Sequence, residues 1–270
     1  MKIITSIFDL NKEIKNYKNV GFVPTMGGIH KGHISLIKAS QKKKNKTIVS
    51  IFVNPTQFNK KIDFRKYPRN IKKDIISLKK LNVNYLFIPK IEDIYKFNSR
   101  KFVLKKKDKI LCAKFRKGHF EGVLNVMNRL MSIIKSKDLF MGEKDYQQLH
   151  LIKKFLSKKF DVRINACPTI RTADKIALST RNKLLNKKSL EKASQIAKLL
   201  IKLKKRSKLY SSKFKLDLSD YKIELENKFN IKIDYLEFRD EKNLKLNNRK
   251  NKFRLFVAYN INGVRLIDNF

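Results

Sequence analysis

The stretch that decides the fold reads Pro24-Thr25-Met26-Gly27-Gly28-Ile29-His30-Lys31-Gly32-His33. It follows an apolar run at 20–23 and precedes an amphipathic run at 34–39, an order that predicts a strand, a glycine-containing turn and a helix. Because glycine has no Cβ, Gly27 and Gly28 let the backbone turn tightly and approach a ligand closely. Backbone N–H groups at the positive end of a helix dipole favour phosphate. The stretch therefore predicts a phosphate-binding turn.

Two histidines in this stretch are spaced for joint action. His30 and His33 are three residues apart, so on a first helical turn they share a face. Imidazoles directed at a polyphosphate would donate hydrogen bonds to oxygens that gain charge as a phosphoanhydride breaks. Taken singly, Gly-Gly after a strand is usually only a turn, and one histidine usually belongs to the core or surface. However, four of the eight glycines and two of the four histidines lie within 21–33, which favours a nucleotide site.

The composition is strongly basic. Among 270 residues, 65 Lys and Arg against 23 Asp and Glu give a net charge of +42. Such a field attracts phosphate backbones, but the lysines are spread over most of the length. Abundant Lys, Asn, Ile and Phe without Trp instead indicate the codon bias of an AT-rich genome. We therefore expect no nucleic-acid partner, although acidic small substrates would profit from the field within the ~8–10 Å that salt leaves unscreened.

The cysteines and the hydropathy pattern predict the compartment. Cys112 and Cys167 lie far apart without metal-ligand spacing, as in a reduced cytosolic chain with buried thiols. No stretch approaches the roughly 20 apolar residues that a membrane span needs. We therefore expect a soluble, cytoplasmic protein without a membrane partner.

The first two thirds of the chain alternate strand and helix signals. We expect strands at 20–23, 47–53, 85–88, 138–141 and 162–167, and helices at 71–81, 91–95, 123–134 and 146–156. This succession is typical of an α/β fold with a doubly wound, Rossmann-like parallel sheet, here over residues 1–175. The lysine-rich segment 101–116 is interpreted as one strand and an exposed loop.

The remaining third has a different pattern. Helices are expected at 190–203 and 216–229, a half-exposed strand at 231–238, and a closing β-hairpin from 253–259 and 264–267. Residues 176–270 therefore predict a smaller C-terminal α+β domain.

Polar residues follow several predicted strands, where ligands bind in open parallel sheets. Asn54 and Gln57 follow the second strand, with a polar loop as the simpler interpretation. Gly142-Glu143-Lys144-Asp145 forms a second strand–glycine–helix start with a lysine for phosphate. Ser179-Thr180-Arg181 is either a helix cap beside a surface arginine or a phosphate clamp.

The ordered set of motifs resembles the pantothenate synthetase family over nearly the whole chain. His-x-Gly-His alone marks a nucleotidyltransferase superfamily, whereas the Asn-Pro-x-Gln-Phe and Gly-Glu-Lys-Asp-x-Gln-Gln-Leu motifs are far more specific. The matching segments are Pro24-Thr25-Met26-Gly27, His30-x-Gly32-His33, Phe52-Val53-Asn54-Pro55-x-Gln57-Phe58, Tyr67-Pro68-Arg69 with Asp74, Gly118-His119-Phe120-x-Gly122-Val123, Gly142-Glu143-Lys144-Asp145-x-Gln147-Gln148-Leu149, Leu178-Ser179-x-Arg181-Asn182 and Arg265-Leu266-Ile267-Asp268-Asn269.

The resemblance implies an ATP-dependent carbon–nitrogen ligase that makes pantothenate, the coenzyme A precursor. The carboxylate of (R)-pantoate would attack the α-phosphate of ATP, giving pantoyl-adenylate and pyrophosphate, and β-alanine would then displace AMP. No nucleophilic side chain is required, so positioning and charge stabilisation must dominate. The family also implies Mg²⁺ with ATP, no tightly bound cofactor, a homodimer, and a C-terminal domain that covers the active site.

The resemblance also implies roles for individual residues. His33 would donate a proton to the leaving group, His30 would lie beside the phosphates and Lys144 would hold phosphate oxygens. Gln57 and Gln148 would bind pantoate or β-alanine, Arg116 and His119 would belong to a lid, and the metal ligands are unassigned. The residues expected to bind ATP are Met26, Gly27, Gly28, Ile29, His30, Lys31, Gly32, His33, Gly142, Glu143, Lys144, Asp145, Ile170, Leu178, Ser179, Thr180 and Arg181.

Several positions depart from the family pattern. Lys117 replaces a proline between the lid arginine and its glycine, Thr180 replaces a serine, Lys175 replaces the glycine of an Asp-Gly turn, and Gly28 replaces a larger residue. None removes a group that the chemistry needs, so we expect an active enzyme of reduced rigidity. The alternatives are another His-x-Gly-His adenylyl- or cytidylyltransferase, which would not need Gln57 and Gln148, and a basic nucleic-acid-binding protein.

Overall fold

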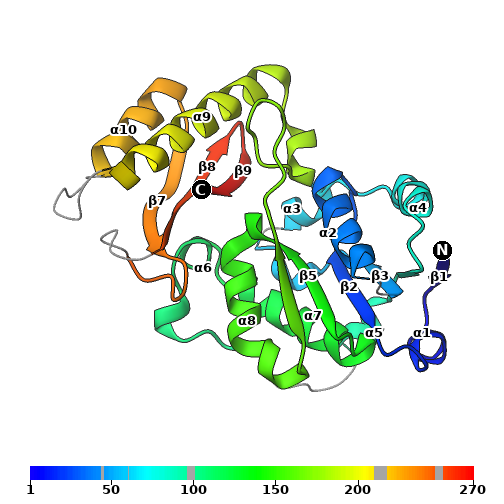
Figure 1. Ribbon diagram of the computed structural model, residues 1–270. Helices are drawn as coiled ribbons and strands as arrows, with labels where there is room; N and C mark the ends of the chain where they lie inside the picture. Colours follow the sequence, from blue (N-terminus) through cyan, green and yellow to red (C-terminus); the bar gives the residue numbers. More distant parts are fainter. Residues whose placement is uncertain (44–45, 60, 96–100, 210–217, 247–251) are drawn as a thin grey trace. The chain divides into compact units, whose positions relative to one another are not determined.

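The structure, a computed structural model, describes residues 1–43, 46–59, 61–95, 101–209, 218–246 and 252–270. The chain divides into two compact units, Met1–Ile170 and Arg171–Phe270, whose elements are labelled in Figure 1. Within the described residues no helix is both long and apolar enough to cross a membrane.

The first unit is built on a six-stranded parallel sheet in the order β1-β4-β3-β2-β5-β6. All five predicted strands are confirmed. The expectation missed β1, which has only three residues and therefore little pattern to detect. The strands are β1 Lys2–Ile4, β2 Val20–Thr25, β3 Lys46–Ile51, β4 Tyr85–Phe87, β5 Asp138–Gly142 and β6 Arg163–Cys167.

Both faces of this sheet are buried, which explains the near-continuous apolar runs of its central strands. On one face, Val23, Val49 and Phe140 pack with Ile37 of α2 and Leu78 of α4. On the other face, the alternating positions Phe22, Ile48 and Leu139 are fully buried as well. The sheet thus has the covered faces of a doubly wound fold.

Helices and short 3₁₀ turns connect the strands of this unit. Side-chain caps start several of them: Ser6 accepts from the Asp9 N–H at α1, and Asn70 accepts from the Lys73 N–H at α4. The helices are α1 Ile7–Ile14, α2 Lys31–Lys42, α3 Lys61–Lys66, α4 Ile71–Lys80, α5 Ile91–Tyr95, α6 Cys112–Phe115, α7 His119–Ile134 and α8 Tyr146–Phe160, and the turns are η1 Pro55–Gln57, η2 Lys106–Asp108 and η3 Glu143–Asp145.

The strand expected within 101–116 is wrong. Residues 101–116 contain η2 and α6 and no strand. Gln147 of α8 holds the segment instead of a neighbouring strand, because its amide donates to the Ile110 carbonyl and accepts from the Cys112 N–H. The loop is also less exposed than expected, since Asp108 and Leu111 are buried and Asp108 forms an ion pair with Lys154.

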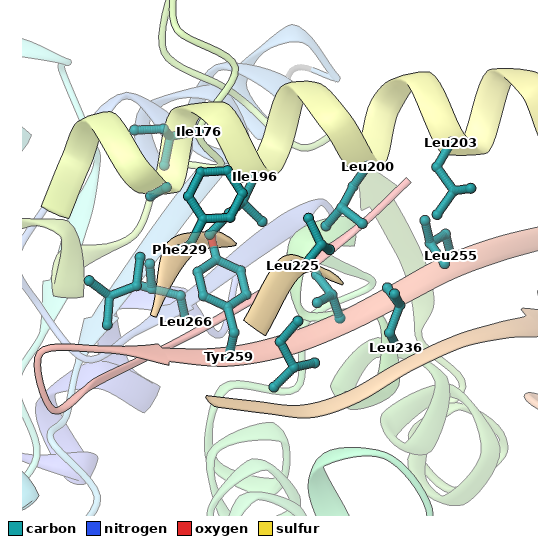
Figure 2. Packing of buried hydrophobic residues seen from close by; sticks show 14 of the residues in the cluster. Ile176, Ile196, Leu200, Leu203, Leu225, Phe229, Leu236, Leu255, Tyr259 and Leu266 are labelled. Carbon is teal, nitrogen blue, oxygen red and sulfur yellow. The ribbon is translucent and has the colours of Figure 1, made fainter. Parts of the chain in front are cut away.

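The second unit packs two helices on a three-stranded antiparallel sheet, β7-β8-β9. Figure 2 shows Leu200 of α9 and Leu225 of α10 in one cluster with Leu236, Leu255 and other core side chains. The α+β character is confirmed, although residues 216 and 217 of the expected second helix lie outside the described residues. The elements are η4 Thr180–Leu184, α9 Lys187–Leu209, α10 Leu218–Phe229, β7 Lys232–Asp240, β8 Phe253–Ile261 and β9 Val264–Asn269.

Strand β7 does not keep a strict alternation. A β-bulge between Ile233 and Tyr235 shifts the phase, so that Ile233 and Leu236 both reach the core. Asp234, in the bulge, accepts a hydrogen bond from Arg265 at 2.7 Å. The hairpin from β8 to β9 closes through Asn262-Gly263, both at positive φ, as in a two-residue hairpin turn.

Candidate functional site

The connectivity of the first unit defines a switch point between β2 and β5. From β2 the chain runs to β3 and β4 on one side, and β5 then pairs with β2 on its other side. Ligands of doubly wound sheets bind at the carboxyl ends of the strands where the order reverses. Met26 to His33 follows β2, and Gly142 to Asp145 follows β5. The two predicted strand–glycine–helix starts therefore belong to neighbouring parallel strands.

The turn after β2 is held by an acidic residue from elsewhere. Gly27 and Gly28 have φ of +79° and +65°, in the left-handed region. The Gly28 N–H donates to Asp74 Oδ2 and the Ile29 N–H to Asp74 Oδ1, both at 2.8 Å. The Gly27 N–H donates to Thr25 Oγ1 at 3.1 Å. Three successive amide groups of the expected phosphate turn thus have partners within the protein.

The two histidines of the motif are brought together, as expected from their spacing. His30 is the N-cap of α2, and its Nδ1 accepts from the Gly32 N–H at 3.1 Å. The ring centroids of His30 and His33 are 4.1 Å apart. Because an accepting Nδ1 carries no proton, the neutral His30 ring in this arrangement has its proton on Nε2. His30 therefore offers an N–H donor at the ring edge away from the helix.

Gln57 lies in η1, after β3, with its amide already oriented. Its Oε1 accepts from Asn54 Nδ2 at 3.1 Å, while its Nε2 donates toward Met26 Sδ at 2.8 Å. Asn54 is itself fixed, because its Oδ1 accepts from Thr56 and from the Tyr95 hydroxyl. Gln57 is buried, at 8% exposure, and its amide N–H group lies beside Met26 at the start of the turn that follows β2.

Arg116 and His119 contact the backbone of Gln57. His119 Nδ1 lies 2.8 Å from the Gln57 carbonyl oxygen, and Arg116 Nη1 lies 2.8 Å from His119 Nε2. A carbonyl only accepts, so Nδ1 carries the imidazole proton and Nε2 accepts from Arg116. The helix that follows begins at His119, earlier than the expected 123, after Gly118 at φ +80°. A Cβ at Gly122 would lie 2.6 Å from the Thr56 carbonyl oxygen, so glycine permits this close approach.

The second strand–glycine–helix start is also present. Glu143, Lys144 and Asp145 form η3 after β5, and the Lys144 ammonium lies 3.4 Å from Asp145 Oδ1. The two neighbouring glutamines of α8 differ in environment. Gln147 is buried and holds the 110–112 backbone, whereas Gln148 is half-buried on an adjacent face of the helix.

The remaining predicted ATP residues are divided between the units. Ile170 is half-buried and ends the first unit, whereas Leu178, Ser179, Thr180 and Arg181 belong to the second. The cap interpretation of the hydroxyls is confirmed for Ser179, whose Oγ accepts from the Arg181 N–H at the start of η4. Lys175 adopts φ +72°, so the turn without its usual glycine is made in the left-handed region.

A resident metal centre is not apparent among the described residues. They contain no group of three or more His, Cys, Asp or Glu side chains able to hold an ion. Asp74, a buried carboxylate, instead accepts hydrogen bonds from the Gly28 and Ile29 N–H groups of the turn that follows β2.

A doubly wound parallel sheet with a glycine turn and a histidine pair at its switch point, where ligands of such sheets bind, is consistent with the His-x-Gly-His nucleotidyltransferase class. The family model of pantoate-β-alanine ligase matches residues 2–270. The chain belongs to this family.

Individual relatives agree with that assignment. The chain is 37% identical over 279 residues to the pantothenate synthetase of Flavobacterium psychrophilum, covering 97% of this chain and 98% of the relative. It is 39% identical over 273 residues to that of Francisella tularensis subsp. novicida, covering 99% and 95%.

Solved structures show the same fold. The pantoate-β-alanine ligase of Francisella tularensis, complexed with β-γ ATP and β-alanine, aligns with a TM-score of 0.84 at 39% identity, covering 100% of this chain and 97% of that one. The pantothenate synthetase of Thermus thermophilus gives a TM-score of 0.86 at 28% identity, covering 100% and 99%.

Three supporting contacts were not expected from the sequence. The contact of Asp74 with the turn has a detectable signal, since a carboxylate lies on the same helical face as Ile71, Ile75 and Leu78. A charged residue on an apolar face requires a buried partner. The clamp by Gln147 and the Tyr95–Asn54 contact have no comparable signal, because each depends on segments distant in sequence.

Proposed function

We propose that this chain condenses (R)-pantoate with β-alanine at the expense of ATP, through a pantoyl-adenylate. The observation that carries the proposal is the histidine pair at the switch point of a sheet whose next polar loop presents the Gln57 amide. A nucleotide-binding half and an acid-binding half then lie at the same edge of one sheet. Membership of the pantoate-β-alanine ligase family supports the same reaction.

In the first step, a carboxylate oxygen of pantoate attacks the α-phosphorus of ATP and the bond to the bridging oxygen of pyrophosphate breaks. Charge gathers on that leaving oxygen. His30, with its proton on Nε2, and His33 supply hydrogen-bond donors there, and Lys144 supplies a positive charge. In the second step, the β-alanine amine attacks the acyl carbon, loses a proton and releases AMP.

The acid substrate is recognised by amide groups rather than by a further cation. Gln57 Oε1 is occupied by Asn54, so Gln57 offers its N–H to an oxygen of pantoate. Gln148 supplies a second amide from the first turn of α8. Because two neutral donors bind an oxygen without neutralising it, the pantoate carboxylate keeps the charge that makes it nucleophilic.

We further propose how a metal ion, a partner subunit and the compartment enter this function. Mg²⁺ enters as part of MgATP, held mainly by phosphate oxygens and water as is usual for this ion. Ser179 and Arg181, from the smaller unit that begins at Arg171, bind phosphate oxygens of ATP, and Arg116 and His119 belong to a lid. The protein acts as a cytoplasmic homodimer. Two buried free thiols, Cys112 and Cys167, support a reducing compartment.

The proposal is tested by following pyrophosphate and AMP separately. ATP, Mg²⁺ and D-pantoate without β-alanine should give pyrophosphate in an amount close to that of the enzyme, as the adenylate accumulates. Adding β-alanine should start continuous AMP formation. If pantoate does not promote pyrophosphate release, but the acceptor substrate of an adenylyl- or cytidylyltransferase does, the chain has the activity of a different nucleotidyltransferase.

A further inference from the structure

We infer that Asp74 is a positioning residue that fills the anion-binding turn Gly27-Gly28-Ile29 from within, so that this turn does not hold the phosphates of ATP. This inference rests on the proposed function, since it concerns how the nucleotide site is built. The Gly28 and Ile29 N–H groups then bind the Asp74 side chain of α4, and phosphate binding is left to the histidines and Lys144.

The geometry is that of an occupied anion nest. Successive backbone N–H groups of a turn can point toward one place, where an anion is usually bound. Here Asp74 Oδ2 lies 2.8 Å from the Gly28 nitrogen, and Asp74 Oδ1 lies 2.8 Å from the Ile29 nitrogen. Asp74 is 4% exposed. A Cβ on Gly27 would lie 2.9 Å from Asp74 Oδ2, so the carboxylate occupies the turn at contact distance.

Asp74 is held in this place by a rigid element. It lies one turn into α4, which Asn70 caps, and Leu78 on the same helix is fully buried in the core. A buried carboxylate that lost these two donors would be left as an uncompensated charge, which is strongly unfavourable. The turn and the helix are therefore coupled, and the carboxylate has no low-energy way to leave when ATP arrives.

The occupied turn also fixes the start of α2, the helix that carries His33 and that His30 caps. Ile29 donates to Asp74 and is followed directly by His30, the N-cap of α2. A change in the conformation of the turn would move the His30 and His33 rings relative to the triphosphate. A displacement of about 1 Å in a positioned catalytic group lowers the rate by up to ~10²-fold.

The first test is the pair Asp74→Asn and Asp63→Asn in the pantoate-dependent release of pyrophosphate. Both variants remove one negative charge, but Asp63 is exposed on α3. Asp74→Asn turns an amide donor toward one of the two N–H groups, so we expect kcat to fall about 10- to 100-fold while KM for ATP changes less than about threefold. Asp63→Asn should match the wild type. If Gly28 and Ile29 bound phosphate directly, Asp74→Asn would lower KM for ATP and keep kcat, which would overturn the inference.

The second test observes the turn without relying on activity. Labelling with ¹⁵N-glycine gives only eight backbone signals, because the chain has eight glycines. The Gly28 amide proton should be shifted downfield by the carboxylate, exchange slowly, and stay so when ATP is added. It should move upfield in Asp74→Asn, provided that the other seven signals report an intact fold. A Gly28 signal that leaves its position on addition of ATP to the wild type contradicts the inference.

Chemical rescue separates a carboxylate role from a general packing role. In Asp74→Ala the turn is empty, and added formate should restore part of kcat without affecting the wild type or Asp63→Asn. No rescue in a variant whose thermal unfolding shows a folded chain would contradict the inference. A wild type that fails to release pyrophosphate with pantoate would instead contradict the proposed function, which keeps the two failures apart.

Discussion

The imidazole rings of His30 and His33 lie against each other, with centroids 4.1 Å apart and planes inclined by 33°. The His30 ring is fixed at one edge because its Nδ1 accepts the Gly32 N–H. The two rings therefore form a preorganised pair rather than two independent side chains. Its geometry is set by the helix start that His30 itself caps.

Replacement of His33 by alanine should slow adenylate formation by roughly 10²–10³-fold, which is the usual effect of removing one preorganised donor. His33 lies within the first turn of α2 and is only half-buried, so its loss should leave the fold intact. Rapid-quench measurement of pyrophosphate formation reports the step directly. A loss below tenfold would give His33 a structural role only.

His30 should show two separable roles. His30→Asn keeps an acceptor for the helix N-terminus but loses the ring donor, so its unfolding should resemble that of the wild type while adenylate formation is slow. His30→Ala should in addition lose about 0.5–2 kcal/mol of unfolding free energy, the usual cost of an N-cap. Urea unfolding and pyrophosphate release on the two variants check this. Equal unfolding free energies of the two variants would contradict the role of His30 as the N-cap of α2.

Gly27 should tolerate alanine less well than Gly118, although both adopt φ near +80°. Alanine in the left-handed region costs about 1–2 kcal/mol at either position. A Cβ at Gly118 meets nothing within 4 Å, whereas at Gly27 it lies 2.9 Å from Asp74 Oδ2 and 3.3 Å from Ile51 Cγ2. Gly27→Ala should therefore lower the free energy of unfolding more than Gly118→Ala in the same urea titration. Equal losses would mean that Asp74 does not approach the turn closely.

Asp138 should make stability depend on pH. This carboxylate is 2% exposed and accepts from Arg163 Nε at 2.7 Å and from Asn165 at 2.8 Å. The Arg163 hydrogen bonds hold the pKa of Asp138 well below its usual range, against the opposing effect of burial. A lowered pKa contributes stability that is present above the ordinary pKa of about 3.9 and is lost as the pH falls below it.

Asp138→Asn should accordingly lower the free energy of unfolding by about 1–3 kcal/mol at pH 7, with the difference from the wild type shrinking below about pH 4. Asp63→Asn, at an exposed position, should change it by less than about 0.5 kcal/mol at any pH. Unfolding titrations at pH 7, 5 and 3.5 provide the comparison. A difference that stays constant down to pH 3.5 would contradict the role of the Asp138 charge.

Strand and helix periodicity was enough to predict the sheet of the first unit and the α+β nature of the second. Phe22, Ile48 and Leu139 belong to strongly apolar runs that local pattern detects. The segment 101–116 could not be predicted in this way, because its conformation depends on Gln147, which is distant in sequence. By contrast, the contact of His30 with His33 follows from their local spacing. The local pattern marks Asp74 only as a charge on an apolar helix face, and does not predict that it fills the turn between β2 and α2.

In the proposed reaction, pantoate becomes an adenylate before the amine attacks. The most direct measurement follows oxygen from pantoate labelled with ¹⁸O in its carboxylate during turnover with MgATP and β-alanine. The attacking carboxylate oxygen becomes bonded to the α-phosphorus and leaves with the nucleotide, so mass spectrometry of the AMP should show one ¹⁸O atom per molecule. AMP without ¹⁸O, formed alongside the amide product, would contradict the acyl-adenylate and with it the proposed function.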